Sequence, residues 1–128
     1  MGWREDTEFE PYGHFDKMIE DCSAAMEIVA DIIRFQNAYK QSDTNNDLPR
    51  SFNFKELEKA AGKYTVYEIY VGPKNSFRAI IMFPHKRLQE RLLAYWVFLF
   101  KKQRQNDRPM VNRAKALARE CWNSIEGA

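Results

Sequence analysis

Three apolar segments decide the fold, and they read KYTVYEIYVG (63–72), SFRAIIMF (76–83) and LLAYWVFLFKKQR (92–104). Each is dense in β-branched and aromatic residues and is bounded by turn-forming residues, so each is predicted to be a β-strand. The third segment has nine consecutive uncharged residues, from Leu92 to Phe100, which is typical of a central strand covered on both faces. The chain becomes basic at the end of this strand.

Residues with helical periodicity lie on both sides of the three strands. From Phe15 to about Lys40, apolar residues recur at steps of three and four, which predicts one amphipathic helix. Its predicted core-facing stripe is Phe15, Ile19, Cys22, Met26, Val29 and Ile33. A final helix is predicted after Pro109, with Asn106 or Asp107 as its cap.

The remaining segments are predicted to be short. Residues 54–61 are expected to form a short helix that ends at Gly62, and residues 42–51 a loop rich in Asn, Asp and Ser. A short strand is expected around residues 3–9. Because strands joined by short connections pair most simply with their neighbours, residues 1–128 are predicted to form one α+β domain. It would contain an antiparallel β-meander, N-terminal helices on one face and a C-terminal helix.

Composition excludes several classes of protein. The chain has 128 residues and 45% hydrophobic content, which is enough for one globular core and argues against disorder. No segment is long and apolar enough to cross a membrane, and the acidic start lacks the apolar core of a signal peptide, so a cytoplasmic location is expected. The two histidines and two cysteines lack metal-ligand spacing, and no glycine-rich phosphate loop is present. We therefore expect neither a metal nor a cofactor.

Charge is distributed unevenly along the chain. Residues 1–48 hold four basic and eleven acidic side chains, whereas residues 84–128 hold ten basic and four acidic ones. This division indicates a cationic surface on the C-terminal half, which suits a polyanion or an acidic protein segment.

The candidate functional residues are cations around the predicted sheet. Arg78 lies inside an apolar strand, where an arginine needs solvent, a ligand or a partner such as Glu68. A basic strand end and a basic flank of the last helix follow; these residues are Lys101, Lys102, Arg104, Arg108, Lys115 and Arg119. Taken separately, they are compatible with salt bridges and solvated surfaces. If they converge, they would form a groove for a phosphate backbone, with aromatic residues such as Tyr70 available for stacking.

The order of these residues resembles the RelE/ParE superfamily of bacterial toxins, and most of all its HigB-like, phage-derived branch. The resemblance covers about residues 54–122. It is carried by Tyr67-Glu68-Ile69-Tyr70-Val71, Phe77-Arg78-Ala79, Phe98-Leu99-Phe100-Lys101-Lys102, and Pro109 opening a helix that contains Ala114. The chain departs from RelE itself on the first of the three strands, where Glu68 and Tyr70 stand in place of lysines.

The resemblance implies the toxin of a type II toxin–antitoxin system, a metal-independent endoribonuclease that cuts mRNA on the translating ribosome. Arg78 corresponds to the strand arginine near the scissile phosphate, and Lys102 to the basic residue that stabilises the transition state, with Lys101 beside it. Apart from the resemblance, Glu68 is a candidate general base, and His85 is suggested to reach the site. The residues expected to bind RNA are Arg104, Arg108, Lys115, Arg119 and Tyr70.

The resemblance also implies partners. They are a cognate antitoxin, which contributes acidic and apolar side chains, together with the ribosome and mRNA, and a higher-order toxin–antitoxin complex. Membrane association and direct reading of DNA by this chain are not expected. Two other functions remain open: a ParE-like inhibitor of DNA gyrase, and a noncatalytic phage-derived interaction module.

Overall fold

The computed structural model describes residues 3–42 and 48–126. In chain order its elements are the 3₁₀ helix η1 (Trp3–Asp6), β1 (Glu8–Pro11), α1 (Phe15–Glu20), α2 (Ala25–Gln41), β2 (Phe54–Ala60), β3 (Tyr64–Val71), the 3₁₀ turn η2 (Pro73–Asn75), β4 (Phe77–Pro84), β5 (Leu93–Lys101) and α3 (Arg108–Glu126). The three predicted strands and the last helix are confirmed. Part of the predicted loop at 42–51 lies outside the described residues.

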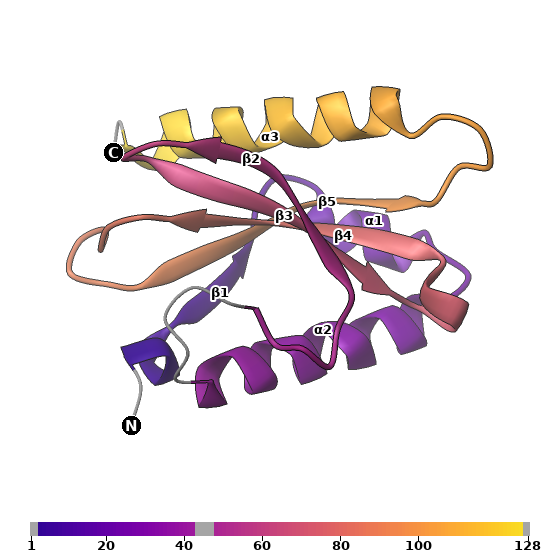
Figure 1. Ribbon diagram of the computed structural model, residues 1–128, viewed down its shortest axis with the longest axis horizontal. Coiled ribbons are helices and arrows are strands. Elements are labelled where there is room, and N and C mark those ends of the chain that lie inside the picture. The colour runs from indigo at the N-terminus through magenta and orange to yellow at the C-terminus, as the bar shows by residue number, and fades with distance from the viewer. Residues whose placement is uncertain (1–2, 43–47, 127–128) are drawn as a thin grey trace.

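The described residues form one α+β unit around a five-stranded sheet with the order β1-β5-β4-β3-β2 (Figure 1). Strands β3 to β5 pair antiparallel in the predicted order, with pairs such as Tyr70 with Arg78 and Arg78 with Phe100, and β2, which was not predicted as a strand, adds a further antiparallel pair. The sheet as a whole is nevertheless mixed, because β1 pairs in parallel with β5, placing Phe9 beside Ala94. The prediction of a purely antiparallel sheet was therefore wrong.

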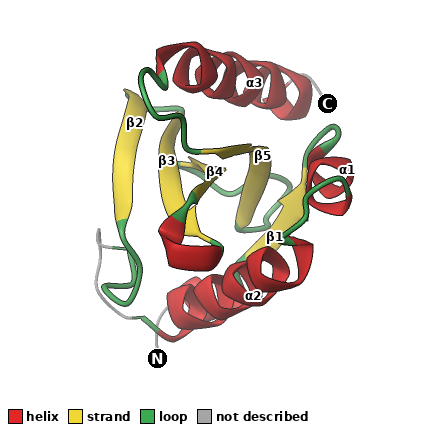
Figure 2. Ribbon diagram, turned by 90° about the vertical axis from the view of Figure 1, so that its right-hand side faces the viewer, coloured by secondary structure: helices red, strands yellow, loops and turns green. Residues whose placement is uncertain are grey.

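Helices cover both faces of the sheet, as expected for so apolar a central strand. Figure 2 shows α2 on one face, α3 on the opposite face, and α1 beside β1. Trp96 of β5 packs into the core beneath α2, whereas the next residue, Val97, packs into the core beneath α3. Strand β5 is buried on both sides, which explains why its sequence does not alternate.

The long helix predicted from Phe15 is interrupted. α1 ends at Glu20 and α2 begins at Ala25, so the apolar periodicity of the second half has a different phase from that of the first. The buried residues of α2 are Ile28, Ile32, Phe35 and Tyr39. Of the predicted stripe, Met26 and Ile33 are 89% and 50% exposed, so this part of the core prediction was wrong.

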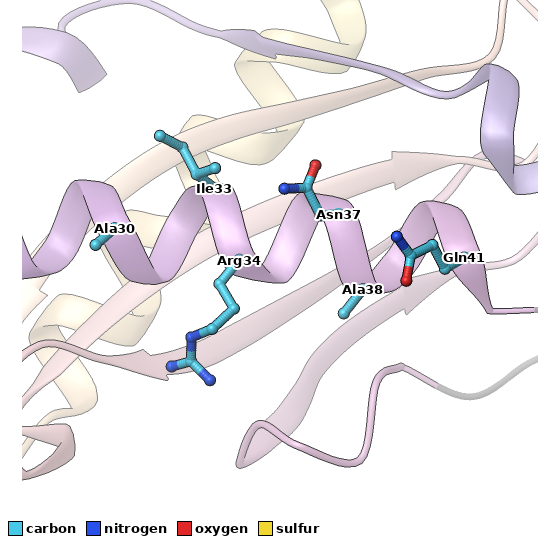
Figure 3. A pocket seen from close by; sticks show the side chains of 6 residues that line it. All are labelled: Ala30, Ile33, Arg34, Asn37, Ala38 and Gln41. Atoms are coloured by element: carbon cyan, nitrogen blue, oxygen red, sulfur yellow. The ribbon is translucent and has the colours of Figure 1, made fainter.

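The exposed side of α2 carries a shallow, open hollow. Its lining residues are Ala30, Ile33, Arg34, Asn37, Ala38 and Gln41 (Figure 3). All six belong to one helix, so the hollow has no second wall from another element. It contains no cluster of titratable groups that would suit a chemical site.

The short helix predicted at residues 54–61 is instead the edge strand β2. Its sequence, FKELEKA, contains residues that favour a helix, but pairing with β3 provides backbone partners and overrides this local preference. Charged side chains are common on edge strands because they discourage pairing with other chains. Gly62, with a φ of 79°, lies in the turn between β2 and β3 and caps no helix.

None of the helices in residues 3–42 and 48–126 is both long enough and apolar enough to span a membrane.

Candidate functional site

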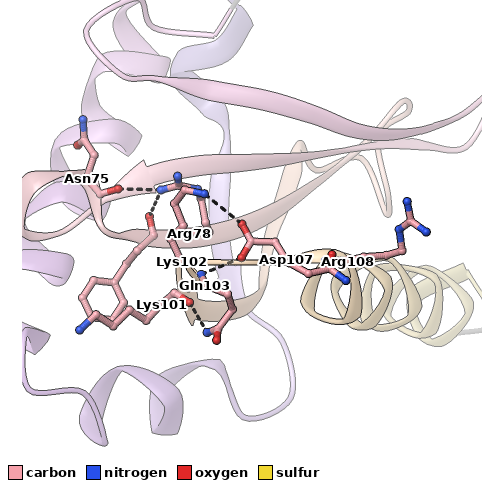
Figure 4. Close-up of polar contacts among 9 residues, drawn as sticks. Asn75, Arg78, Lys101, Lys102, Gln103, Asp107 and Arg108 are labelled. Atoms are coloured by element: carbon pink, nitrogen blue, oxygen red, sulfur yellow. Dashed lines mark hydrogen bonds and ion pairs between the residues drawn. The ribbon is translucent and has the colours of Figure 1, made fainter.

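Arg78 lies on the α3 face of the sheet, near the end where the chain leaves β5. Its side chain is buried, with 5% exposure, and Nη1 donates hydrogen bonds to the carbonyl oxygens of Asn75 (2.7 Å) and Phe77 (3.2 Å) (Figure 4). The guanidinium carbon lies 3.6 Å from the centre of the Tyr70 ring, directly across the strand pair. A cation–π contact and two carbonyls thus fix the charge in place, and among the described residues no ion pair joins Arg78 to Glu68.

Glu68 is a second buried charged residue on the same face. It lies two residues before Tyr70 on β3, is 7% exposed, and faces Lys55 across the β2–β3 pair. Burial raises the pKa of the Glu68 carboxyl, although Arg78, Lys55 and Lys102 favour its ionised form; Asp107 raises it further. The environment therefore holds a carboxyl group with an increased affinity for a proton next to several fixed cations.

Lys102 is an accessible cation on the same face. Its backbone N–H bonds to the Ser76 carbonyl (2.8 Å), which extends the ladder beyond β5, and its side chain is 54% exposed. Nζ lies 3.7 Å from Asp107 Oδ2. Because neighbouring residues of an extended chain point to opposite faces, Lys101 lies away from Arg78, as Figure 4 shows. The structure thus brings Lys102 to the site but not Lys101.

Asp107 joins the loop to the start of α3. Oδ1 accepts a hydrogen bond from the Gln103 N–H (2.8 Å), while Oδ2 faces Lys102. The adjacent Asn106 accepts a bond from the Arg108 N–H (3.0 Å), so the side chain that supports the helix start is that of Asn106. Asp107 instead holds the loop against the end of β5 and adds a negative charge to the site.

The residues expected to bind RNA do not form one cluster. Arg104 and Arg108 are exposed near the start of α3, Lys115 lies further along the helix, and Arg119 affects the pKa of Tyr64 at the far end of β3. Arg119 lies eleven positions after Arg108 along the helix, which is about 16 Å. The basic flank is therefore a row along α3, and Figure 4 shows the Arg108 side chain pointing away from Arg78.

His85 lies far from the cluster. It follows the last residue of β4, whereas Arg78 is near the first, which separates them by about 20 Å. His85 Nε2 is 2.7 Å from Thr65 Oγ1. The suggestion that His85 reaches the candidate site was wrong.

The cluster, defined by Lys55, Glu68, Tyr70, Arg78, Lys102 and Asp107, can bind and polarise an anion. Among the described residues no group of three or more histidine, cysteine or carboxylate side chains is placed to hold a metal ion. Lys55 and Asp107 were missed by sequence reasoning. The first could be found only by recognising β2 as a strand, and the second only by knowing how the loop folds.

The fold and cluster define a class: a small α+β domain with a mixed sheet, helices on both faces, and a cationic cluster around one buried carboxyl. Comparison with protein-family models, with curated proteins and with solved structures found no match to this chain.

Proposed function

We propose that the chain is a RelE/ParE-type toxin, closest to the HigB-like branch, that cleaves mRNA on the translating ribosome. The observation that carries the proposal is the position of Arg78 and Lys102 beside the buried Glu68 at one end of the α3 face. Cations held by the protein are what a metal-independent phosphoryl transfer requires, because charge develops on the phosphate oxygens.

In this mechanism the 2′-hydroxyl of the RNA attacks the adjacent phosphorus. The new 2′-O–P bond forms as the P–5′-O bond breaks, and the charge of the phosphorane is neutralised by Lys102 directly and by the field of the buried Arg78. Glu68 accepts the proton of the 2′-hydroxyl through a bridging water, because its side chain is buried, and its raised pKa makes it a better proton acceptor near neutral pH than an ordinary carboxylate. The leaving 5′-oxygen takes a proton from water or from the ribosome.

Tyr70 is the proposed stacking surface. It is partly exposed and lies over the Arg78 guanidinium, so a base could stack on the outer side of its ring. Arg104 and Arg108 would then hold the RNA backbone beside the entrance to α3. In this proposal Lys101, Lys115 and Arg119 contribute only to long-range attraction for RNA.

Burial of Arg78 favours a second candidate function. A guanidinium with 5% exposure that is bonded to two carbonyls is also what a noncatalytic interaction module would retain for folding. In that case the cationic surface would bind a partner and cut nothing.

The proposed partners follow from the charges. A separate antitoxin would lay acidic and apolar side chains over the cluster, in a complex that includes further copies, and the ribosome would supply the mRNA. The proposed location is the cytoplasm, and no cofactor is required.

Primer extension on an mRNA translated in a purified cell-free system tests the proposal. Cuts that appear only while ribosomes translate are the expected result. Lys102→Ala should reduce cutting by at least about 100-fold, since removal of one donor at a developing anion has an effect of that size. Lys63→Ala is the matched control, because Lys63 is exposed in the turn at the other end of the sheet.

An intact message in the presence of folded protein would reject the nuclease function. A gyrase supercoiling assay run in parallel then decides between the alternatives: inhibition supports the ParE-like function, and its absence supports the noncatalytic module.

A further inference from the structure

A hollow of about 720 Å³ lies on the α2 face of the sheet, at the end away from Arg78. Its walls come from η1, the end of α2, β2, β3, and the connection from β4 to β5; Thr65, Tyr67 and Phe83 provide the sheet side. Since Arg78 lies on the α3 face and at the opposite end of β4, this hollow is separate from the candidate nuclease site. Its size is that of pockets that hold small organic ligands.

The lining is rich in cations. Arg4 is 3% exposed and lies over the Tyr39 ring, 4.4 Å from its centre, so its charge is fixed within the wall. Lys59 and Arg87 line the hollow from exposed positions on β2 and on the loop after β4. Glu56 is the one carboxylate among the described residues that line it. Among the described residues of the lining, the exposed Lys59 and Arg87 exceed the single negative charge of Glu56, which favours an anion.

One side of the hollow is aromatic. Phe83 stacks on Tyr39, with ring centres 5.1 Å apart, and meets Tyr67 edge to face at 6.0 Å. Tyr67 and Phe83 are both partly exposed. A ligand in the hollow would thus meet aromatic surface beside the charged groups, which suits a molecule with an apolar ring.

A polar pair completes the lining. Thr65 is 7% exposed, and its Oγ1 lies 2.7 Å from Nε2 of His85. Lys59 and burial both lower the pKa of His85, burial having the larger effect. The pair offers hydrogen-bonding groups beside the cations, which a bound phosphate can use.

From this geometry we propose that the hollow binds a small molecule with a phosphate group, held by Lys59 and Arg87. A ring attached to the phosphate would lie against Phe83 and Tyr67. The inference does not depend on the proposed nuclease function, because the two sites share no residue.

Titration of the full chain with adenosine 5′-monophosphate, followed by backbone amide NMR, tests the inference. The expected result is a set of saturable shifts at Thr65, His85 and neighbouring residues of the hollow. Inorganic phosphate and adenosine, titrated separately, show which part of the probe is recognised. Binding of phosphate alone, as tight as that of the nucleotide, assigns the site to free phosphate.

Substitutions at exposed positions make the test specific. Lys59→Gln and Arg87→Gln should each weaken binding of the nucleotide about tenfold, since each removes a charge-assisted hydrogen bond. Lys17→Gln, an exposed change on α1, is the matched control and should leave the affinity unchanged. The inference is overturned if adenosine binds as tightly as its monophosphate, if the shifts map outside the hollow, or if the two substitutions have no effect.

Discussion

Arg78→Ala is expected to destabilise the fold by about 3 kcal/mol. The change removes a charge-assisted hydrogen bond to the Asn75 carbonyl at 2.7 Å, a type of bond that contributes about 1.5–3 kcal/mol. It also removes the contact with the Tyr70 ring at 3.6 Å, which contributes about 1–2 kcal/mol when shielded from water. The two terms share one side chain and do not add fully, so about 3 kcal/mol is the expected total.

Urea denaturation followed by tryptophan fluorescence measures this loss. The midpoint should fall while the slope stays constant, which shows that stability changed and not the extent of unfolding. Lys102→Ala is the control: its side chain is 54% exposed, and the expected change is within about 0.5 kcal/mol. A loss below about 1 kcal/mol for Arg78→Ala would refute the view that these contacts hold the strand ends together.

A loss of stability of this size would also lower the measured activity of Arg78→Ala. Loss of activity in Arg78→Ala would not by itself identify a catalytic group, because part of the protein would be unfolded. Arg78→Lys keeps the charge but lacks the planar fork that stacks on Tyr70 and bonds two carbonyls, so we expect partial recovery of stability. Lys102 is the residue at which activity can be tested without this complication.

Three further predictions concern stability. Glu68→Gln should stabilise the protein at neutral pH. Because folding raises the pKa of Glu68, protonation of its carboxyl stabilises the folded state below pH 4.5, and this contribution is lost as the pH rises through the folded-state pKa. Unfolding curves should show the gain at neutral pH and little below pH 4.5; a loss at neutral pH would contradict the argument. Ile33→Asp should change the free energy of unfolding by less than about 0.5 kcal/mol, whereas Ile32→Asp should cost about 3 kcal/mol, because the two are 50% and 7% exposed. Equal losses of unfolding free energy for Ile32→Asp and Ile33→Asp would contradict the difference in burial between the two residues. Gly72→Ala should cost about 2 kcal/mol, since its φ is 81° and a Cβ would lie 2.8 Å from Phe77 Cδ1; an unchanged midpoint would contradict both the cost of the positive φ and the close contact with Phe77.

The sequence predicted the structure best where the local preference of a segment agrees with its place in the folded chain. Strands β3 to β5 and helix α3 were predicted because their residues have a strong preference and a consistent period. β2 was missed because its local preference is helical and the partner that overrides it, β3, is found only in the folded chain. The phase of α2 was missed because the break after Glu20 has no glycine or proline to mark it.

The residues of the candidate site also differ in whether the sequence could identify them. Arg78 and Lys102 could be identified because a cation inside or directly after an apolar strand is unusual in itself. Lys55 and Asp107 could not, because each reaches the site through pairing or loop geometry. Lys101 was included because it is adjacent to Lys102 in the sequence. The alternation of side chains along an extended chain places it on the other face of the sheet.

Arg78 and Lys102 differ in what an arriving phosphate must displace. Lys102 is half exposed and lies 3.7 Å from Asp107, and an exposed pair of this kind contributes about 1 kcal/mol or less, so a phosphate can replace Asp107 at little cost. Arg78 would have to give up a 2.7 Å bond to Asn75 and its contact with Tyr70. We therefore expect Lys102 to contact the anion and Arg78 to remain in place, acting through its field from beneath Tyr70. On this argument Tyr70→Phe should preserve both the position of Arg78 and activity, since the ring and not the hydroxyl makes the contact.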